Sequence, residues 1–277
     1  MTAAEAMVAA MARLRAAGVP DPARDARVLL AHAAQVDAAR VTLIAPEDMA
    51  ADIIDRYDHL VSLRAVRVPV SQLIGSREFY GRRFNITREV LDPRPETESL
   101  IEAALSAPFS DALDLGVGSG CLIVTLLAER PDAKGVAIDI SEAACLQASA
   151  NAVLHEVADR VQVLKSDWFD AVEGRFDLIV SNPPYLAASE MSQVQPELRD
   201  HEPRLALTDE ADGLTAYRVI AAEAQGYLSA EGRVLVETGW QQASSVRDIF
   251  EAQGWGELSI LPDLGGRDRI VSASKPG

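Results

Sequence analysis

The chain has 277 residues, 48% of them hydrophobic and 25% charged, enough to bury a large α/β core and a small second domain. Its formal net charge of −16 argues against tight binding to bare nucleic acid, because such binding relies on basic side chains that displace counterions. No apolar run approaches the roughly 20 residues of a membrane span, and no signal-peptide pattern opens the chain. We therefore expect a cytoplasmic protein that binds neither membranes nor a specific nucleic-acid sequence.

The two cysteines, Cys121 and Cys145, lie near no second cysteine or histidine at metal-ligand spacing. We expect both to be buried free thiols. The four histidines fall in no catalytic pattern, so the sequence predicts no metal site.

Apolar residues recur at helical spacing over residues 2–17, 22–35 and 47–66. They predict a helical bundle over residues 1–70, whose role would be to dock a substrate or partner. Residues 71–90 alternate in polarity and predict a β-hairpin that links the bundle to the rest of the chain.

The charge is unevenly distributed along the sequence. Residues 1–90 hold 12 Arg and no Lys against 11 acidic residues, whereas residues 91–277 hold 14 basic against 31 acidic residues. Four arginines close together could contact a protein partner or ribosomal surroundings, although an ordinary solvated face is the simpler interpretation; they are Arg77, Arg82, Arg83 and Arg88.

Strands and helices alternate from residue 111 onward, which predicts a doubly wound, mainly parallel sheet in a catalytic domain over residues 91–277. The predicted strands cover residues 111–115, 135–139, 161–165, 176–181 and 232–238. Residues 257–261 and 269–272 follow each other too closely for a helix between them. They predict an antiparallel hairpin that supplies an antiparallel strand at the edge of the sheet.

Three alternating glycines, Gly116, Gly118 and Gly120, follow the first predicted strand and precede a helical run. Glycines in such a loop let the backbone approach a ligand, and the helix N-terminus offers free amide donors. The second strand ends in Asp139, about 20 residues past the loop, where an acid binds ribose hydroxyls in βαβ nucleotide sites.

A dehydrogenase would need its third glycine at position 121, which is Cys121. The spacing found here, with Asp114 two residues before the first glycine, resembles the loop of class I S-adenosylmethionine-dependent methyltransferases. An acid suits that cofactor because it carries a sulfonium and an ammonium group instead of a pyrophosphate. The resemblance implies S-adenosylmethionine as cofactor and S-adenosylhomocysteine as product.

Asn182, Pro183, Pro184 and Tyr185 directly follow the fourth predicted strand. The two prolines fix their own φ and restrict the residue before them, so the Asn182 side chain and nearby carbonyls are held in one arrangement. Such a turn can grip a planar group that bears an NH2. The motif resembles that of amino-methyltransferases, which methylate exocyclic NH2 groups of bases or the amide of glutamine.

Two further blocks, residues 77–81 and 90–98, extend the resemblance to the release factor glutamine methyltransferase family, of the HemK or PrmC type. Weaker matches continue to the end of the chain, in residues 202–207, 212–214, 237–241 and 263–271. Asp92 departs from the pattern, since an apolar residue is common there. The resemblance implies methyl transfer to the side-chain amide nitrogen (N5) of the glutamine in the Gly-Gly-Gln motif of class I peptide chain release factors.

The resemblance also implies roles for single residues. Asp139 would bind the ribose, Asp167 and Trp168 the adenine, and Asp114 the methionine end, unless Asp114 only braces the loop. Glu98 is a weaker cofactor candidate, and Thr97 can be read as a helix cap. The remaining cofactor residues are Gly116, Val117, Gly118, Ser119, Gly120 and Asn182.

For the substrate, Asn182 and the Pro183 carbonyl would each accept one hydrogen of the glutamine NH2, and Tyr185 would pack on the amide plane. Pro184 and Arg94 complete the predicted substrate site. Two other functions remain open: an N6-adenine or ribosomal RNA amino-methyltransferase, which should show a basic face, and a non-catalytic cofactor-binding scaffold, which should have lost Asn182 or a loop glycine.

Overall fold

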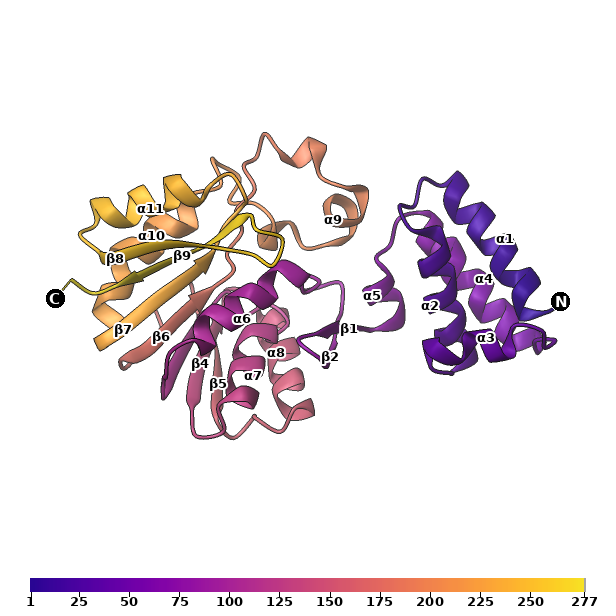
Figure 1. Cartoon of the computed structure of the whole chain (residues 1–277), viewed down its shortest axis with the longest axis horizontal. Helices are drawn as coiled ribbons and strands as arrows, with labels where there is room; N and C mark the ends of the chain where they lie inside the picture. Colours follow the sequence, from indigo (N-terminus) through magenta and orange to yellow (C-terminus); the bar gives the residue numbers. More distant parts are fainter. Residues whose placement is uncertain (277) are drawn as a thin grey trace. The chain divides into compact units, whose positions relative to one another are not determined.

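The computed structural model describes residues 1–276, which form two compact units (Figure 1). Unit 1 contains Met1–Ser76 and Gln195–His201, and unit 2 contains Arg77–Val194 and the chain from Glu202 onward. Within residues 1–276, no helix combines the length and the apolar character that a membrane span requires.

Unit 1 is helical, with a buried core of its own. Its helices are α1 (Ala3–Ala16), α2 (Pro22–Ala34), η1 (Ala38–Arg40), α3 (Val41–Ile44), α4 (Ala51–Ala65) and α5 (Val70–Ile74). Thr2 caps α1 and Asp21 caps α2, and side chains such as Leu14 and Leu29 are fully buried between the helices. The third predicted helix begins later than expected, and the short helices η1 and α3 before it were not predicted.

Helix α9 (Pro196–His201) also belongs to unit 1, although sequence reasoning assigns its residues to the catalytic domain. Arg64 Nε lies 2.7 Å from Asp25 Oδ2, and Arg64 Nη2 lies 2.9 Å from Glu197 Oε1. Arg67 forms a further ion pair with Glu197. Buried charges are tolerated only when they are paired, so this cluster fixes α9 within unit 1.

A two-stranded sheet of β1 (Ser76–Phe79) and β2 (Arg82–Asn85) begins at the last residue of the first segment of unit 1 and otherwise belongs to unit 2. It occupies the central part of the predicted hairpin segment. The main sheet contains β3 (Asp111–Leu115), β4 (Lys134–Asp139), β5 (Val161–Lys165), β6 (Phe176–Ser181), β7 (Leu228–Glu237), β8 (Gly256–Pro262) and β9 (Asp268–Ser274).

The strand order in the main sheet is β5-β4-β3-β6-β7-β9-β8. Strands β3 to β7 pair in parallel, and β9 pairs antiparallel with both β7 and β8. The doubly wound sheet and the C-terminal hairpin are therefore confirmed. The antiparallel strand was expected at the edge, but it lies one strand inside, because β9 returns between β7 and β8.

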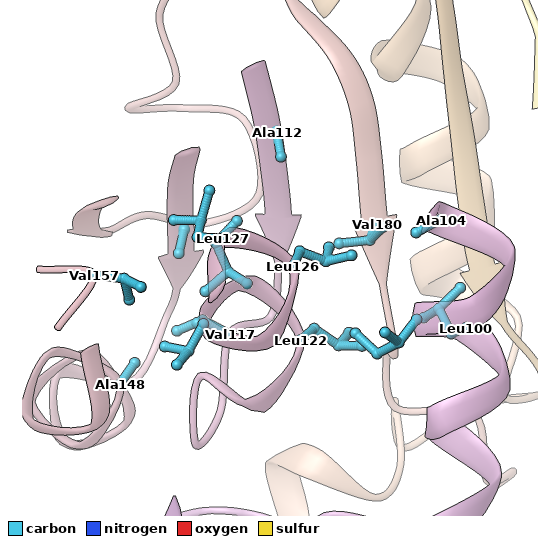
Figure 2. Close-up of a cluster of buried hydrophobic side chains, with 14 of the residues drawn as sticks. Leu100, Ala104, Ala112, Val117, Leu122, Leu126, Leu127, Ala148, Val157 and Val180 are labelled. Carbon is cyan, nitrogen blue, oxygen red and sulfur yellow. The ribbon is translucent and has the colours of Figure 1, made fainter. Parts of the chain in front are cut away.

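Helices cover both faces of the main sheet. One face packs against α6 (Glu98–Leu105), α7 (Cys121–Glu129) and α8 (Glu142–Leu154), and the other against α10 (Thr215–Glu223) and α11 (Ala243–Ala252). Figure 2 shows Leu122 and Leu126 of α7 in the cluster that also contains Leu100 of α6 and Val180 of β6. The remaining short helices of this unit are η2 (Pro95–Thr97), η3 (Met191–Gln193), η4 (Arg204–Ala206) and η5 (Ala224–Tyr227).

The strand register brings the functional loops together. Leu115 of β3 pairs with Ser181 of β6, and the Ser181 hydroxyl donates to the Leu115 carbonyl at 2.7 Å. The glycine loop and the Asn-Pro-Pro-Tyr turn therefore begin side by side. The chain order reverses between β3 and β6, and ligands of open α/β sheets bind at such a switch point, beyond the carboxyl ends of the strands.

Candidate active site

A cavity of about 270 Å³ lies at the carboxyl ends of β3 to β6. The glycine loop lines it, together with residues at the ends of β4, β5 and β6. Chain segments 89–94 and 203–206 contribute the remaining lining. The predicted site residues that line it are Arg94, Gly116, Val117, Gly118, Ser119, Asp139, Asp167, Trp168, Asn182 and Pro184.

The three loop glycines serve two purposes. All have positive φ, at 79° for Gly116, 52° for Gly118 and 82° for Gly120, a region that other residues rarely adopt. A Cβ on Gly116 or Gly118 would meet no neighbouring atom within 4 Å, so both leave open space at the cavity. A Cβ on Gly120 would lie 3.1 Å from Ala148 Cα, so this glycine allows α8 to pack closely against the loop.

Asp114 lies beneath the loop and does not line the cavity. Its Oδ2 accepts the Ile123 backbone N–H at 3.3 Å, which braces the start of α7, and its buried Oδ1 has no partner. Burial raises the pKa of Asp114 to about 7, although the Ile123 hydrogen bond lowers it. A cation bound above the loop would favour the ionised form, so bracing and charge pairing are compatible.

Asp139 ends β4 at the cavity wall. Its Oδ2 accepts from the Gly118 backbone N–H at 3.0 Å, and its Oδ1 accepts from the Ser141 N–H at 2.9 Å. Burial raises the pKa of Asp139, and these backbone hydrogen bonds lower it. The N-cap of α8 is Ser141, so Asp139 is not needed as a helix cap. Each carboxylate oxygen of Asp139 keeps a lone pair that can accept from a hydroxyl group.

Asp167 and Trp168 follow β5 and line the next part of the cavity. Asp167 is exposed, whereas Trp168 is half-buried and both packs against the core and lines the cavity. The Ser166 hydroxyl donates to the Trp168 carbonyl at 2.8 Å, and Trp168 has a φ of 46°.

The two cysteines are free but half-buried, which corrects the expectation that both are buried.

Arg94 lines the cavity and belongs to a cluster of charged side chains whose two carboxyls, Asp92 and Glu202, are buried. Its guanidinium forms an ion pair with Glu202 and lies 4.0 Å from Asp92, which in turn lies 3.8 Å from Arg77. Attraction to Glu202 and Asp92 raises the pKa of Arg94 against the opposing effect of burial. Asp92, at a position where an apolar residue is common, therefore has two arginine neighbours with which an apolar residue could not pair.

Thr97 and Glu98 make contacts that the sequence did not predict, and the capping role of Thr97 is not observed. Thr97 makes no capping hydrogen bond to α6, and its hydroxyl instead accepts the Asn182 side-chain N–H at 3.1 Å. Glu98 accepts the Tyr80 backbone N–H at 2.9 Å and does not line the cavity.

Asn182 lines the cavity at the end of β6, the strand next to the one that carries the glycine loop. Its Nδ2 is engaged by Thr97, while its buried Oδ1 has no hydrogen-bond partner. Pro183 is buried, and the Tyr185 carbonyl accepts from Gln242 Nε2 at 2.8 Å, which fixes the far end of the turn. Burial raises the pKa of Tyr185 to about 12, so the ring is neutral.

Sequence reasoning missed Glu237, the last residue of β7. Only 1% of it is exposed, and burial raises its pKa to about 7. Its position after an apolar strand run was the available signal, but the neighbours that make it notable come from strands far apart in the sequence.

The site fits S-adenosylmethionine. Asp114 and Asp139 offer negative charge and acceptors, the glycine loop leaves room for close backbone approach, and Trp168 offers an aromatic surface. A pyrophosphate would instead meet these acids with repulsion. Together with Asn182 at the adjacent strand end, the fold and site define a class I S-adenosylmethionine-dependent methyltransferase.

Comparison with known proteins narrows the class to a family. Residues 91–201 match the methyltransferase small domain, and residues 5–75 match the PrmC N-terminal domain. The release factor glutamine methyltransferase of Cereibacter sphaeroides is 53% identical over 276 residues, covering 100% of this chain and 99% of that protein. Its counterpart in Caulobacter vibrioides is 39% identical over 281 residues, covering 99% and 97%. The chain belongs to the release factor glutamine methyltransferase family.

Among solved structures, the hMettl16 catalytic domain in complex with MAT2A 3'UTR hairpin 6 superimposes with a TM-score of 0.60 and 16% identity. The superposition covers 79% of this chain and 82% of that chain. At this identity the likeness establishes the fold and carries no information about substrate.

Proposed function

We propose that this protein transfers a methyl group from S-adenosylmethionine to the side-chain amide nitrogen (N5) of the glutamine in the Gly-Gly-Gln motif of class I peptide chain release factors. Full-length similarity to the relatives that carry this name supports the substrate. The single observation that carries the chemistry is Asn182, which lines the cavity next to the glycine loop and has an unpartnered acceptor oxygen. The proposal places the protein in the cytoplasm, where release factors act.

The cofactor, when bound, supplies an electrophilic methyl group on a sulfonium centre. Asp139 would accept hydrogen bonds from the ribose hydroxyls, and Asp167 and Trp168 would contact the adenine. Asp114, beneath the loop, would stabilise the positive end of the cofactor through its charge. Gly116 and Gly118 would let their backbone approach the ligand without a side chain in between.

An amide nitrogen is a weak nucleophile because its lone pair is delocalised into the carbonyl. Asn182 Oδ1 and the Pro183 carbonyl would each accept one N–H of the glutamine, which favours localisation of the lone pair on nitrogen. The rigid prolines hold both acceptors in place before the substrate arrives. Orientation of this kind can supply several of the roughly 7–11 kcal/mol available from proximity in favourable cases.

We also propose that residues 1–70 dock the release factor. Their match to the PrmC N-terminal domain supports this role. Within the part of the chain that the structure describes, the cavity lining includes no residue of unit 1, so these residues would act on recognition rather than on chemistry.

Incubation of the purified protein with labelled S-adenosylmethionine tests the substrate. Release factor, duplex DNA and ribosomal RNA are offered in parallel, together with a release factor whose Gly-Gly-Gln glutamine is replaced by alanine. We expect label on the intact release factor alone. Label on adenine would keep the fold and the Asn182 chemistry but overturn the substrate, and cofactor binding without transfer would favour a scaffold.

A further inference from the structure

Glu237 lies beside Asn182 because of the strand register. Ser181 of β6 pairs with Val236 of β7, so the next residue on each strand is Asn182 and Glu237. The Tyr217 hydroxyl donates to the Glu237 carbonyl at 2.8 Å and anchors this strand end. Thr97, which is 2% exposed, completes a compact group of three polar side chains.

The carboxyl of Glu237 interacts with both other members of this group. Burial raises the pKa of this carboxyl to about 7, and repulsion by Glu96 adds to the rise, whereas hydrogen bonding from Thr97 and Asn182 and attraction to Arg269 lower the pKa. Its Oε2 has no hydrogen-bond partner. This buried group therefore contains a carboxyl with one oxygen still free to accept.

The order of donors and acceptors in this group decides how the Asn182 amide is turned. A hydroxyl can donate or accept, and an asparagine side chain can be rotated to present either oxygen or NH2, so Thr97 alone does not select an orientation. A carboxylate only accepts. When ionised Glu237 accepts a hydrogen bond from the Thr97 hydroxyl, the Thr97 oxygen can only accept in turn, which requires the Asn182 NH2 to face it and leaves Oδ1 free.

We propose that Glu237, acting together with Thr97, is a positioning residue that holds the Asn182 amide with Oδ1 presented to the target nitrogen. The inference rests on the proposed function. A carboxylate behind the amide NH2 also polarises the amide, because hydrogen bonds in a chain strengthen one another, and so improves Oδ1 as an acceptor. Glu237 touches neither cofactor nor substrate in this account.

Glu237→Gln is the first variant. Glutamine has nearly the same shape as glutamate but can donate as well as accept, so it no longer fixes which way the Asn182 amide is turned. We expect kcat for release factor methylation to fall about tenfold, with cofactor affinity by calorimetry unchanged within twofold, since one weakened charge-assisted hydrogen bond is worth roughly that much. Glu231→Gln, an exposed position on the same strand, is the matched control and should leave kcat unchanged.

A double-mutant cycle separates positioning from a general structural role. In an Asn182→Ala background, where no amide remains to be turned, Glu237→Gln should cause no further loss of single-turnover rate. Equal losses with and without Asn182 would overturn the inference. A wild-type enzyme that leaves the release factor unmethylated would overturn the proposed function and this inference with it, whereas active wild type with additive losses overturns the inference alone.

Thr97 provides an independent test if Glu237→Gln folds poorly. Thr97→Val keeps the shape but removes the hydroxyl, and Thr97→Ser keeps it. We expect a loss of about tenfold in kcat for Thr97→Val, without a change in cofactor affinity, and near wild-type kcat for Thr97→Ser. Similar kcat values for the valine and serine variants would contradict the proposal that Glu237 orients Asn182 through the Thr97 hydroxyl.

Discussion

The carboxyl ends of β3 and β4 differ from those of β6 and β7 in how their polar side chains are satisfied. On the first pair, Asp139 accepts two backbone N–H groups and Asp114 accepts one, so the chain itself holds these carboxyls. On the second pair, the Asn182 side chain bonds to the Thr97 side chain instead of to the backbone. Buried acceptors without partners remain on Asn182 and Glu237, as one does on Asp114 of the first pair.

This difference separates a binding half from a reacting half of the site. Backbone hydrogen bonds fix the loop that would hold the cofactor, whether or not a ligand is present. The unpartnered Asn182 Oδ1 costs roughly 1–3 kcal/mol of free energy, and in our account the target amide of the substrate completes it. Changes in the two halves should therefore affect different steps.

The largest effect is expected in the reacting half. Asn182→Ala removes an acceptor aimed at the target nitrogen, so kcat should fall by about 10²–10³, as for other groups that act mainly in the transition state. Cofactor affinity, measured by calorimetry, should stay within a few-fold of wild type. Unchanged turnover would remove Asn182 from the mechanism, and lost cofactor affinity would erase the contrast between the halves.

The next effect concerns stability and pH. Burial raises the pKa of Glu237 from 4.5 in the unfolded chain to about 7 in the folded protein, so only the unfolded chain releases this proton between these values. Stability should therefore fall as pH rises through this window, by up to about 3 kcal/mol from this group.

Glu237→Gln lacks that proton, which makes the pH effect measurable. The melting temperature of the variant relative to wild type should increase from pH 5 to pH 8. A constant or decreasing difference would mean that Glu237 titrates outside this window. Asp114, whose pKa is also raised to about 7, changes equally in both proteins and cancels from the comparison.

A smaller effect is expected in the binding half. Asp139→Ala should weaken cofactor binding about ten- to thirtyfold, because it removes charge-assisted hydrogen bonds to the ribose. Turnover at saturating cofactor should change far less. Asp132→Ala, an exposed acid just before β4, is the matched control. Unaltered affinity of the Asp139 variant would place the ribose elsewhere.

The smallest effect tests the two uses of the loop glycines. Gly120→Ala should lower stability by about 1–2 kcal/mol, since it combines a positive φ with a Cβ 3.1 Å from Ala148 Cα. Gly118→Ala has the unfavourable positive φ but not this close contact, so it should lower the melting temperature less than Gly120→Ala does. It should weaken cofactor binding more than Gly120→Ala does, because Gly118 lines the cavity. Equal binding losses for both variants would contradict the division between packing and ligand approach.

The fold was largely predictable because its signals are local. Each parallel strand is a short apolar run followed by a turn or helix, and β3, β5 and β6 have the predicted bounds. β7 begins four residues earlier than predicted, at Leu228, because its first part pairs with β6 through a register shift that periodicity does not reveal. The placement of β9 between β7 and β8 likewise depends on pairing over distance.

The site was predictable only where one segment carries the chemistry. The glycine loop and the Asn182 turn are continuous motifs and were found. Thr97 and Glu237 meet Asn182 from segments 85 and 55 residues away along the chain, so no spacing rule connects them. The same applies to α9, whose place in unit 1 depends on Arg64 and Glu197, 133 residues apart.

The most direct test is a crystal structure of the enzyme with S-adenosylhomocysteine and a release factor, which traps the reactants without methyl transfer. Our account predicts that the Gly-Gly-Gln amide nitrogen lies within about 2.7–3.2 Å of both Asn182 Oδ1 and the Pro183 carbonyl oxygen, with Asn182 Nδ2 on Thr97. A glutamine amide held elsewhere, or an Asn182 that presents Nδ2 to it, would contradict the account.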